Sequence, residues 1–305
     1  EKGKGLLAGA LFSRFPFAIL KARQETNVRG AGVLLHISSL PSPFGIGDMG
    51  PEARHFAEFL YRTKQKYWQL LPLNPTEEGQ GYSPYSALSS KAGYPLLISP
   101  ELLVKDGLLQ APDLAQRKLP RESRTDFREA ERVKEELFEL AFAAFLQAKE
   151  HPLQEEFKHY LKKEKAWLED FALFMQLKKA HEGKAWFDWK EEYKKRDEES
   201  LKKFAQKHSK ELKKIKWLQF IFARQWHGLR SYCNSRNIRF IGDLPFYISY
   251  DSSDVWADST QFAIDEEGRR TGMAGVPPDA FSDDGQLWGM PVFRWDVMKE
   301  TGYAW

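Results

Sequence analysis

Three short apolar runs, each followed by a loop rich in proline, glycine and aromatic residues, are the features that most constrain the fold of this chain. They span residues 31–37, 66–73 and 239–244, which are ordinary strand lengths. Between the first two runs, residues 52–63 place apolar side chains at helical spacing. A strand, a helix and a second strand joined by short links form a right-handed βαβ unit. We therefore expect the three runs to be parallel neighbours, in chain order, in one sheet.

A long, strongly charged region separates the second run from the third. Residues 119–237 repeat their apolar positions at helical spacing, and the region is too long for a single crossover helix. We predict an α/β fold, namely the N-terminal part of a (β/α)8 TIM barrel with about three strands and a helical subdomain inserted between strands 2 and 3. Three strands cannot close a barrel. Either the fold is not a barrel, or the chain lacks its second half.

Composition excludes several classes of function. The formal charge is +3, and lysines alternate with glutamates as on solvated helix faces, so no nucleic-acid partner is predicted. No apolar run reaches the roughly 18 residues of a membrane span. The chain has one cysteine, Cys233, which excludes an internal disulfide and fits a reducing cytoplasm. Its spacing from Phe222, Trp226 and Leu229 predicts a buried helix position for it.

The third apolar run carries a carboxylate, Asp243, at its end. The run otherwise reads as a fully buried strand, where a carboxylate is costly unless it is hydrogen-bonded or faces a polar cleft. In barrels of parallel strands, active sites form at this end of the strands. The long loop that follows combines carboxylates, glycines and prolines with aromatic side chains such as Trp256, Phe281 and Trp288. Carbohydrate, with apolar ring faces and many hydroxyls, suits such a loop, although Asp243 alone fits a helix cap or a structural acceptor equally well.

Four long motifs resemble one known family. They are RGAGVLLHISSLPSPFGIGDMG, GYSPYSALSSKAGYPLLISPELL, GDLPFYISYDSSDVWA and AGVPPDAFSDDGQLWGMPVFRW. They closely resemble the 4-α-glucanotransferases of glycoside hydrolase family 77, also called amylomaltases or disproportionating enzymes. The resemblance covers roughly residues 29–305.

The resemblance implies a set of substrate-binding residues. Asp243 matches a supporting aspartate of the glucan cleft, and many family members carry an aromatic residue where this chain has Ala280. From the residues alone, the Ser-Pro-Tyr turn could be ordinary, and the aromatic side chains could simply anchor their loop. The full set implied by the resemblance is Ser83, Tyr85, Asp243, Asp279, Phe281, Gln286 and Trp288.

The catalytic residues implied by the resemblance are not found in this sequence. A retaining glucanotransferase needs a nucleophile and a general acid, with carboxyl groups about 5–5.5 Å apart. In the family the nucleophile lies in an Arg-x-Asp-His-Phe motif. Arg294-Trp-Asp296 begins in the same way but continues Val-Met, so we reject it. We expect both catalytic groups beyond Trp305.

The boundaries of the resemblance suggest a division of the chain. Family members commonly begin near RGAGVLLH, so residues 1–28 are expected to be a leader of uncertain origin and residues 29–305 a partial catalytic barrel, with the helical insertion at about 119–237. The leader faintly resembles a signal peptide but is interrupted by Arg14 and Pro16. Because the chain opens on Glu1 and stops at Trp305, both ends are expected to be cut.

No cofactor or metal is predicted. Asp251, Asp254 and Asp258, with the acids at 265–267, miss the calcium-loop pattern and are predicted to be solvated turn acids. The resemblance implies a cytoplasmic enzyme of starch or glycogen metabolism that transfers α-1,4-glucan segments to the 4-hydroxyl of an acceptor by a retaining mechanism. Its partners would be maltooligosaccharides and α-1,4-glucans, without nucleic acid or membrane. The alternatives are a non-catalytic α-glucan-binding protein and a related hydrolytic barrel glycosidase.

Overall fold

The core of the structure, a computed structural model that describes residues 29–120 and 124–303, is a small parallel sheet. Its strands are β1 (Gly32–Leu34), β2 (Tyr67–Gln69) and β3 (Arg239–Ile241), in the order β1-β2-β3. Both pairings are parallel. The predicted strand order and direction are therefore confirmed. The leader predicted for residues 1–28 lies outside the described residues.

Each strand has three residues, which is fewer than predicted. In the second run, Pro72 has no N–H to donate, and regular pairing stops before it is reached. The prediction that β3 is fully buried was wrong, because Ile241 is 43% exposed. β3 has only one neighbouring strand among the described residues, whereas the central strand β2 buries Trp68 completely. The indole Nε1 of Trp68 donates to the carbonyl of Leu35 at 2.7 Å.

Helix α2 (Pro51–Arg62) makes the crossover from β1 to β2, which confirms the helix predicted at 52–63. The helix begins with proline, whose missing N–H is not needed in the first turn. Its apolar face buries Ala53, Ala57 and Leu60 completely. Phe56 meets the ring of Trp68 edge-on at 4.8 Å, so α2 is held against the sheet.

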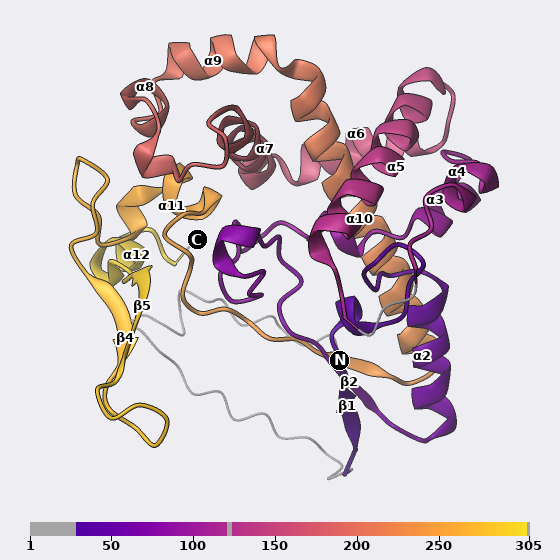
Figure 1. Ribbon diagram of the computed structural model, residues 1–305. Coiled ribbons are helices and arrows are strands. Elements are labelled where there is room, and N and C mark those ends of the chain that lie inside the picture. The colour runs from indigo at the N-terminus through magenta and orange to yellow at the C-terminus, as the bar shows by residue number, and fades with distance from the viewer. Residues whose placement is uncertain (1–28, 121–123, 304–305) are drawn as a thin grey trace, which may run out of the picture.

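Helices dominate the region 119–237, as predicted, and two short helices, α3 and α4, precede it. Figure 1 shows α5 to α10 gathered above the sheet. The longest, α10, leads back to β3 and packs Trp226 against Phe240 at 4.8 Å. Cys233, near its end, is fully buried as expected, and burial raises the pKa of its thiol to about 12. The helices are α3 (Pro100–Lys105), α4 (Ala111–Ala115), α5 (Phe127–Gln147), α6 (Leu153–Lys163), α7 (Lys165–Ala180), α8 (Glu191–Lys194), α9 (Glu198–Lys207) and α10 (Ser209–Ser235).

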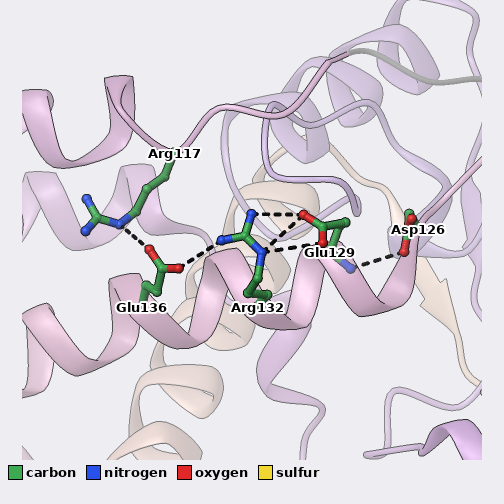
Figure 2. Close-up of polar contacts among 5 residues, drawn as sticks. All are labelled: Arg117, Asp126, Glu129, Arg132 and Glu136. Carbon is green, nitrogen blue, oxygen red and sulfur yellow. Dashed lines mark hydrogen bonds and ion pairs between the residues drawn. The ribbon is translucent and has the colours of Figure 1, made fainter.

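The start of α5 shows how local charges shape these helices. The carboxylate of Asp126 caps the helix by accepting from the backbone N–H of Glu129 at 3.1 Å. Arg132 then pairs with Glu129 and Glu136, three and four residues away, and Arg117 reaches Glu136 from α4's side at 3.0 Å (Figure 2). The two pairs of Arg132 follow helical spacing, and exposed pairs of this kind contribute little to stability.

Buried apolar side chains form two clusters. One surrounds the sheet, α2, α5 and α10. The other joins α7 to the segment after β3 and includes Phe174, Trp186, Trp256 and Phe262. The segment after β3 is therefore packed against the helical region.

The segment after β3 contains more regular structure than the sequence indicated. A two-stranded antiparallel hairpin of β4 and β5 lies at the left of Figure 1. No helix in the described part of the chain combines the length and apolarity needed to cross a membrane. The elements of this segment are α11 (Ser253–Ala257), β4 (Met273–Val276), β5 (Gln286–Pro291) and α12 (Trp295–Glu300).

Candidate functional site

A cavity of about 440 Å³ opens where the loops after β2 and β3 meet the β4–β5 hairpin. The loop after β2 contributes Tyr85, the segment after β3 contributes Asp243, and β5 contributes Trp288. The parallel strands β1, β2 and β3 all end at the same side of their sheet, so residues far apart in the chain converge here. The lining residues are Tyr85, Ser86, Asp243, Leu244, Pro245, Phe246, Tyr247, Trp288 and Met290.

A tyrosine and a carboxylate form the polar pair of the cavity. The hydroxyl of Tyr85 donates to Oδ2 of Asp243 at 2.7 Å. This hydrogen bond raises the pKa of Tyr85, so the phenol stays protonated and remains a donor to the carboxylate. The other carboxylate oxygen of Asp243 has no protein partner among the described contacts and can accept from a ligand hydroxyl.

Aromatic and aliphatic side chains form the rest of the wall. Leu244 is 83% exposed and Phe246 is 70% exposed, which is unusual for side chains of this size. The rings of Tyr247 and Trp288 meet edge-on at 5.8 Å. An exposed apolar wall beside a hydrogen-bonding pair matches a ligand that has apolar faces and hydroxyl edges. A sugar ring has this chemistry.

Ser83 contacts the backbone of Tyr85, one member of the polar pair. It does not line the cavity, but its Oγ accepts from the backbone N–H of Tyr85 at 3.3 Å. Gln286 has a similar relation to the aromatic wall, because its Oε1 accepts from Nε1 of Trp288 at 3.1 Å. The structure therefore brings together five of the seven predicted residues, three in the wall and two in contact with it.

The two remaining predicted residues lie at the tip of the β4–β5 hairpin. Oδ1 of Asp279 accepts from the backbone N–H groups of Phe281 and Ser282 at 2.8 and 3.0 Å, which shapes the turn. Phe281 is 92% exposed and does not line the cavity. Gly285 has φ of +72°, and a Cβ there would lie 2.5 Å from the carbonyl of Val276, so only glycine fits. The tip therefore presents an aromatic ring to solvent.

Sequence reasoning missed six wall residues, namely Ser86, Leu244, Pro245, Phe246, Tyr247 and Met290. Leu244, Phe246 and Tyr247 follow Asp243 directly, and Met290 lies two residues after Trp288. The available signal was the aromatic pair immediately after the strand-end carboxylate. Large apolar side chains outside a regular strand are candidates for a binding surface.

Two of the acids after β3, Asp251 and Asp254, are not the solvated turn acids that the sequence suggested, whereas the acids at 266 and 267 are exposed as expected. Asp254 is 8% exposed, and its carboxylate accepts from the backbone N–H of Ser90 at 2.8 Å and from its Oγ at 2.5 Å. Asp251 pairs with Lys178 at 2.5 Å. Their partners come from segments far away in the chain, which local sequence cannot reveal. The described residues contain no group of three side chains suited to hold a metal ion.

Comparison with known proteins now identifies the chain. Residues 35–305 match the family model described as 4-alpha-glucanotransferase. The chain belongs to the 4-alpha-glucanotransferase family. A 4-alpha-glucanotransferase of Synechocystis sp. is 43% identical over 91% of the chain and 55% of its own length. The Thermus thermophilus 4-alpha-glucanotransferase is 41% identical over 90% of the chain and 54% of its own length.

A solved structure of this family has the same fold. It is an amylomaltase from Streptococcus agalactiae in complex with acarbose, 38% identical, with a TM-score of 0.86 over 91% of this chain and 56% of that chain. This similarity confirms the α/β fold. The chain spans about half the length of the 4-alpha-glucanotransferases that it matches.

Proposed function

We propose that the protein is a 4-α-glucanotransferase whose cavity binds an α-1,4-glucan. The observation that carries the proposal is the Tyr85–Asp243 hydrogen bond of 2.7 Å facing the ring of Trp288, in a chain of this family. The amylomaltase with the same fold was solved in complex with acarbose. The reaction would move a glucan segment to the 4-hydroxyl of an acceptor glucose or glucan.

The predicted site residues would make different kinds of contact with the glucan. Trp288 would stack on the apolar face of a sugar ring, and Asp243 would accept from a sugar hydroxyl. Ser83 and Gln286 would hold the orientations of Tyr85 and Trp288. Asp279 and Phe281 would contact glucan when the hairpin tip closes over it, since closing loops commonly exclude water from such sites. Exclusion of water favours transfer to a sugar over hydrolysis.

Bond cleavage needs groups that the cavity does not hold. The retaining mechanism uses two carboxyl groups about 5–5.5 Å apart, one as nucleophile and one as general acid. Asp243 is the one carboxylate in the wall formed by the described residues. One carboxylate cannot attack the anomeric carbon and also protonate the leaving oxygen opposite it. We propose that the nucleophile and the acid lie beyond Trp305, and that β1, β2 and β3 are the first strands of a (β/α)8 barrel.

We also propose the substrates of the enzyme and its cellular compartment. The substrates would be maltooligosaccharides and α-1,4-glucans, in the cytoplasm and without a cofactor. The single cysteine, fully buried, is compatible with a reducing compartment.

Product analysis with maltotriose tests the proposed function in the full-length protein. Transfer yields both longer and shorter oligomers, hydrolysis yields only glucose and maltose, and a binding protein yields no products. We expect the first pattern. Products limited to glucose and maltose would indicate a hydrolytic glycosidase, and unchanged maltotriose would exclude both enzymes.

A further inference from the structure

A buried lysine contacts both loops that form the cavity, in a position that the proposed reaction does not explain. Lys178, near the end of α7, has a side chain only 6% exposed. Its Nζ lies 2.5 Å from Oδ2 of Asp251 and 3.2 Å from Oε2 of Glu77. The side chain of Asp251 is 11% exposed and that of Glu77 is 23% exposed, so water screens these charges weakly.

The two carboxylates belong to the two loops that build the polar pair. Glu77 lies in the loop after β2, which continues to Tyr85. Asp251 lies eight residues after Asp243, in the segment after β3. Lys178 comes from the helical region, so one ammonium group joins three parts of the chain. The separation of the two loops at this point is set by the reach of one side chain.

The carboxylates depend on this cation. Burial raises the pKa of Glu77, and Lys178 opposes that rise. Oδ1 of Asp251 also accepts from the backbone N–H of Trp186 at 3.1 Å, which fixes its orientation toward the helical region. Without the ammonium group, two partly buried carboxylates would face each other with no cation between them. Such like charges repel, and the loops would separate or rearrange.

A second set of bonds joins the two loops directly, further along the chain. The backbone N–H of Ser253 donates to the carbonyl of Leu88 at 2.8 Å, and Asp254 accepts from Ser90. These bonds lie after Tyr85 in the first loop, whereas Lys178 acts before it. Tyr85 therefore lies between two points of attachment.

We propose that Lys178 is a positioning residue, which holds the loops after β2 and β3 at the separation that brings Tyr85 to Asp243. Its effect on glucan transfer rests on the proposed function, whereas its effect on the loops does not. Lys178 touches no residue of the cavity wall and takes no part in bond cleavage.

The test compares two buried lysines of similar chemistry in the full-length protein. Lys214 in α10 also bridges two carboxylates, those of Glu135 and Glu139 at 2.6 and 2.5 Å, with a side chain 11% exposed. It joins α10 to α5 and touches neither loop. Lys178→Met and Lys214→Met therefore each remove an ammonium group that bridges two carboxylates, at different places, and the partners of Lys214 are the more solvated, at 53% and 57% exposed. Lys178→Arg keeps the charge and serves as the rescue variant.

Hydrogen exchange measures loop positioning without reference to activity. We expect Lys178→Met to speed amide exchange at least tenfold in residues 82–88 and 244–251, while Lys214→Met leaves those segments unchanged and Lys178→Arg restores most of the protection. Equal acceleration in both methionine variants, or no acceleration in the two loops, would overturn the proposal. If the wild-type protein does not transform maltotriose, the proposed function fails, and the exchange result still decides the role of Lys178.

The kinetic coupling between Lys178 and Tyr85 is a readout that a purely structural role would not produce. Misplacement of a binding group by about 1 Å can reduce rates on the order of 100-fold. We expect Lys178→Met to lower kcat/KM for maltotriose by about 10- to 100-fold, and Tyr85→Phe to add little in the double variant. Fully additive losses in the double variant would show that Lys178 does not act through Tyr85.

Discussion

At the scale of single residues, the polar side of the cavity depends on one hydrogen-bond donor, the hydroxyl of Tyr85, whose direction is fixed. The Tyr85 hydroxyl points at one oxygen of Asp243, and Ser83 holds the backbone of the tyrosine. The carboxylate is thereby oriented with its second oxygen available to a ligand. Because Tyr85 is 45% exposed, replacing it should weaken ligand binding far more than it lowers the stability of the fold.

Loss of the Tyr85 hydroxyl should weaken substrate use. Tyr85→Phe removes one hydrogen bond, worth about 1 kcal/mol, so KM for maltotriose should rise roughly fivefold while Tm changes by less than about 2 °C. Steady-state kinetics and thermal melts provide the measurement. Tyr61→Phe, on an exposed tyrosine of α2 outside the cavity wall, is the matched control and should change neither quantity. An unchanged KM in Tyr85→Phe would contradict the role of the polar pair.

Trp288 should contribute more to binding than to stability. It is 37% exposed and belongs to a hairpin, so Trp288→Ala leaves little core cavity. A lost stacking surface should weaken oligosaccharide binding by about 1–3 kcal/mol. Calorimetric titration with maltooligosaccharides and a thermal melt separate the two effects. A large drop in Tm with normal affinity would make Trp288 a structural anchor instead.

Cys233 should be chemically silent in the folded protein. Burial removes it from solvent and raises its thiol pKa to about 12, so almost no thiolate exists at pH 8. We expect no reaction with a disulfide reagent at pH 8 in buffer, and one reactive thiol per chain in denaturant. Rapid labelling of the native protein would contradict the buried position.

At the scale of elements, a buried ion pair attaches α5 to the loop before α2. The side chain of Lys134 is fully buried, and its Nζ lies 2.9 Å from Oδ2 of Asp48. The same ammonium group donates to the carbonyls of Leu96 and Ile98 at 2.7 and 3.0 Å. All three donor protons are therefore used, which is the condition under which a buried charge is tolerated.

Removal of this lysine should destabilise the fold. Lys134→Met leaves the Asp48 carboxylate buried without its cation, and such a loss typically costs about 3–5 kcal/mol. Urea unfolding followed by tryptophan fluorescence measures the change. Adding Asp48→Asn removes the unpaired charge, so the double variant should recover part of the loss. A single variant as stable as the wild type would show that the pair contributes nothing.

Glu101 in α3 should make stability depend on pH. Burial is the main cause that raises its pKa above the ordinary value of 4.5, and nearby Asp48 adds to the rise. The folded state therefore holds this proton more tightly than the unfolded state, so stability falls as pH rises from the unfolded pKa through the folded pKa. Glu101→Gln should stabilise the protein at pH 7 and have no such effect below pH 4.5, as followed by urea unfolding at both pH values. Equal effects at both pH values would exclude the titration of Glu101 as the cause.

At the scale of the whole molecule, apolar surface remains open around the sheet and the cavity. Leu34 and Ile241, on the two outer strands, are 54% and 43% exposed, and Leu244 and Phe246 are more exposed still. β1 and β3 each have one neighbour within the described part of the chain. Unpaired edges and exposed apolar faces of this kind promote association.

Residues 1–305 expressed alone should have no glucanotransferase activity. The retaining mechanism needs two carboxyl groups at fixed separation, and the cavity wall holds one. We also expect the isolated chain to aggregate, because its outer strands are uncovered. Incubation with maltotriose and light scattering provide the measurements. Steady formation of maltotetraose by soluble, uncontaminated protein would show that the catalytic groups lie within this chain.

The sequence by itself determined the order of the elements and the family. Apolar periodicity is a local property, so it located α2, the helices between β2 and β3, and the buried position of Cys233. The parallel order β1-β2-β3 followed from the βαβ rule. The long motifs indicated the family, and the resemblance implied Tyr85, Asp243 and Trp288 as substrate-binding residues. The β4–β5 hairpin was missed because glycines and prolines interrupt its strand pattern.

Only the tertiary structure decided which side chains meet. Tyr85 and Asp243 are 158 residues apart, and their hydrogen bond exists because parallel strands bring their carboxyl ends to one side of the sheet. The partners of Asp251 and Asp254 come from α7 and from the loop after β2, so acids that look solvated in the sequence are buried and paired. Strand length was also decided by pairing, since a strand ends where its neighbour can no longer offer hydrogen bonds. Such contacts depend on packing between distant segments, and local sequence patterns carry no information about that packing.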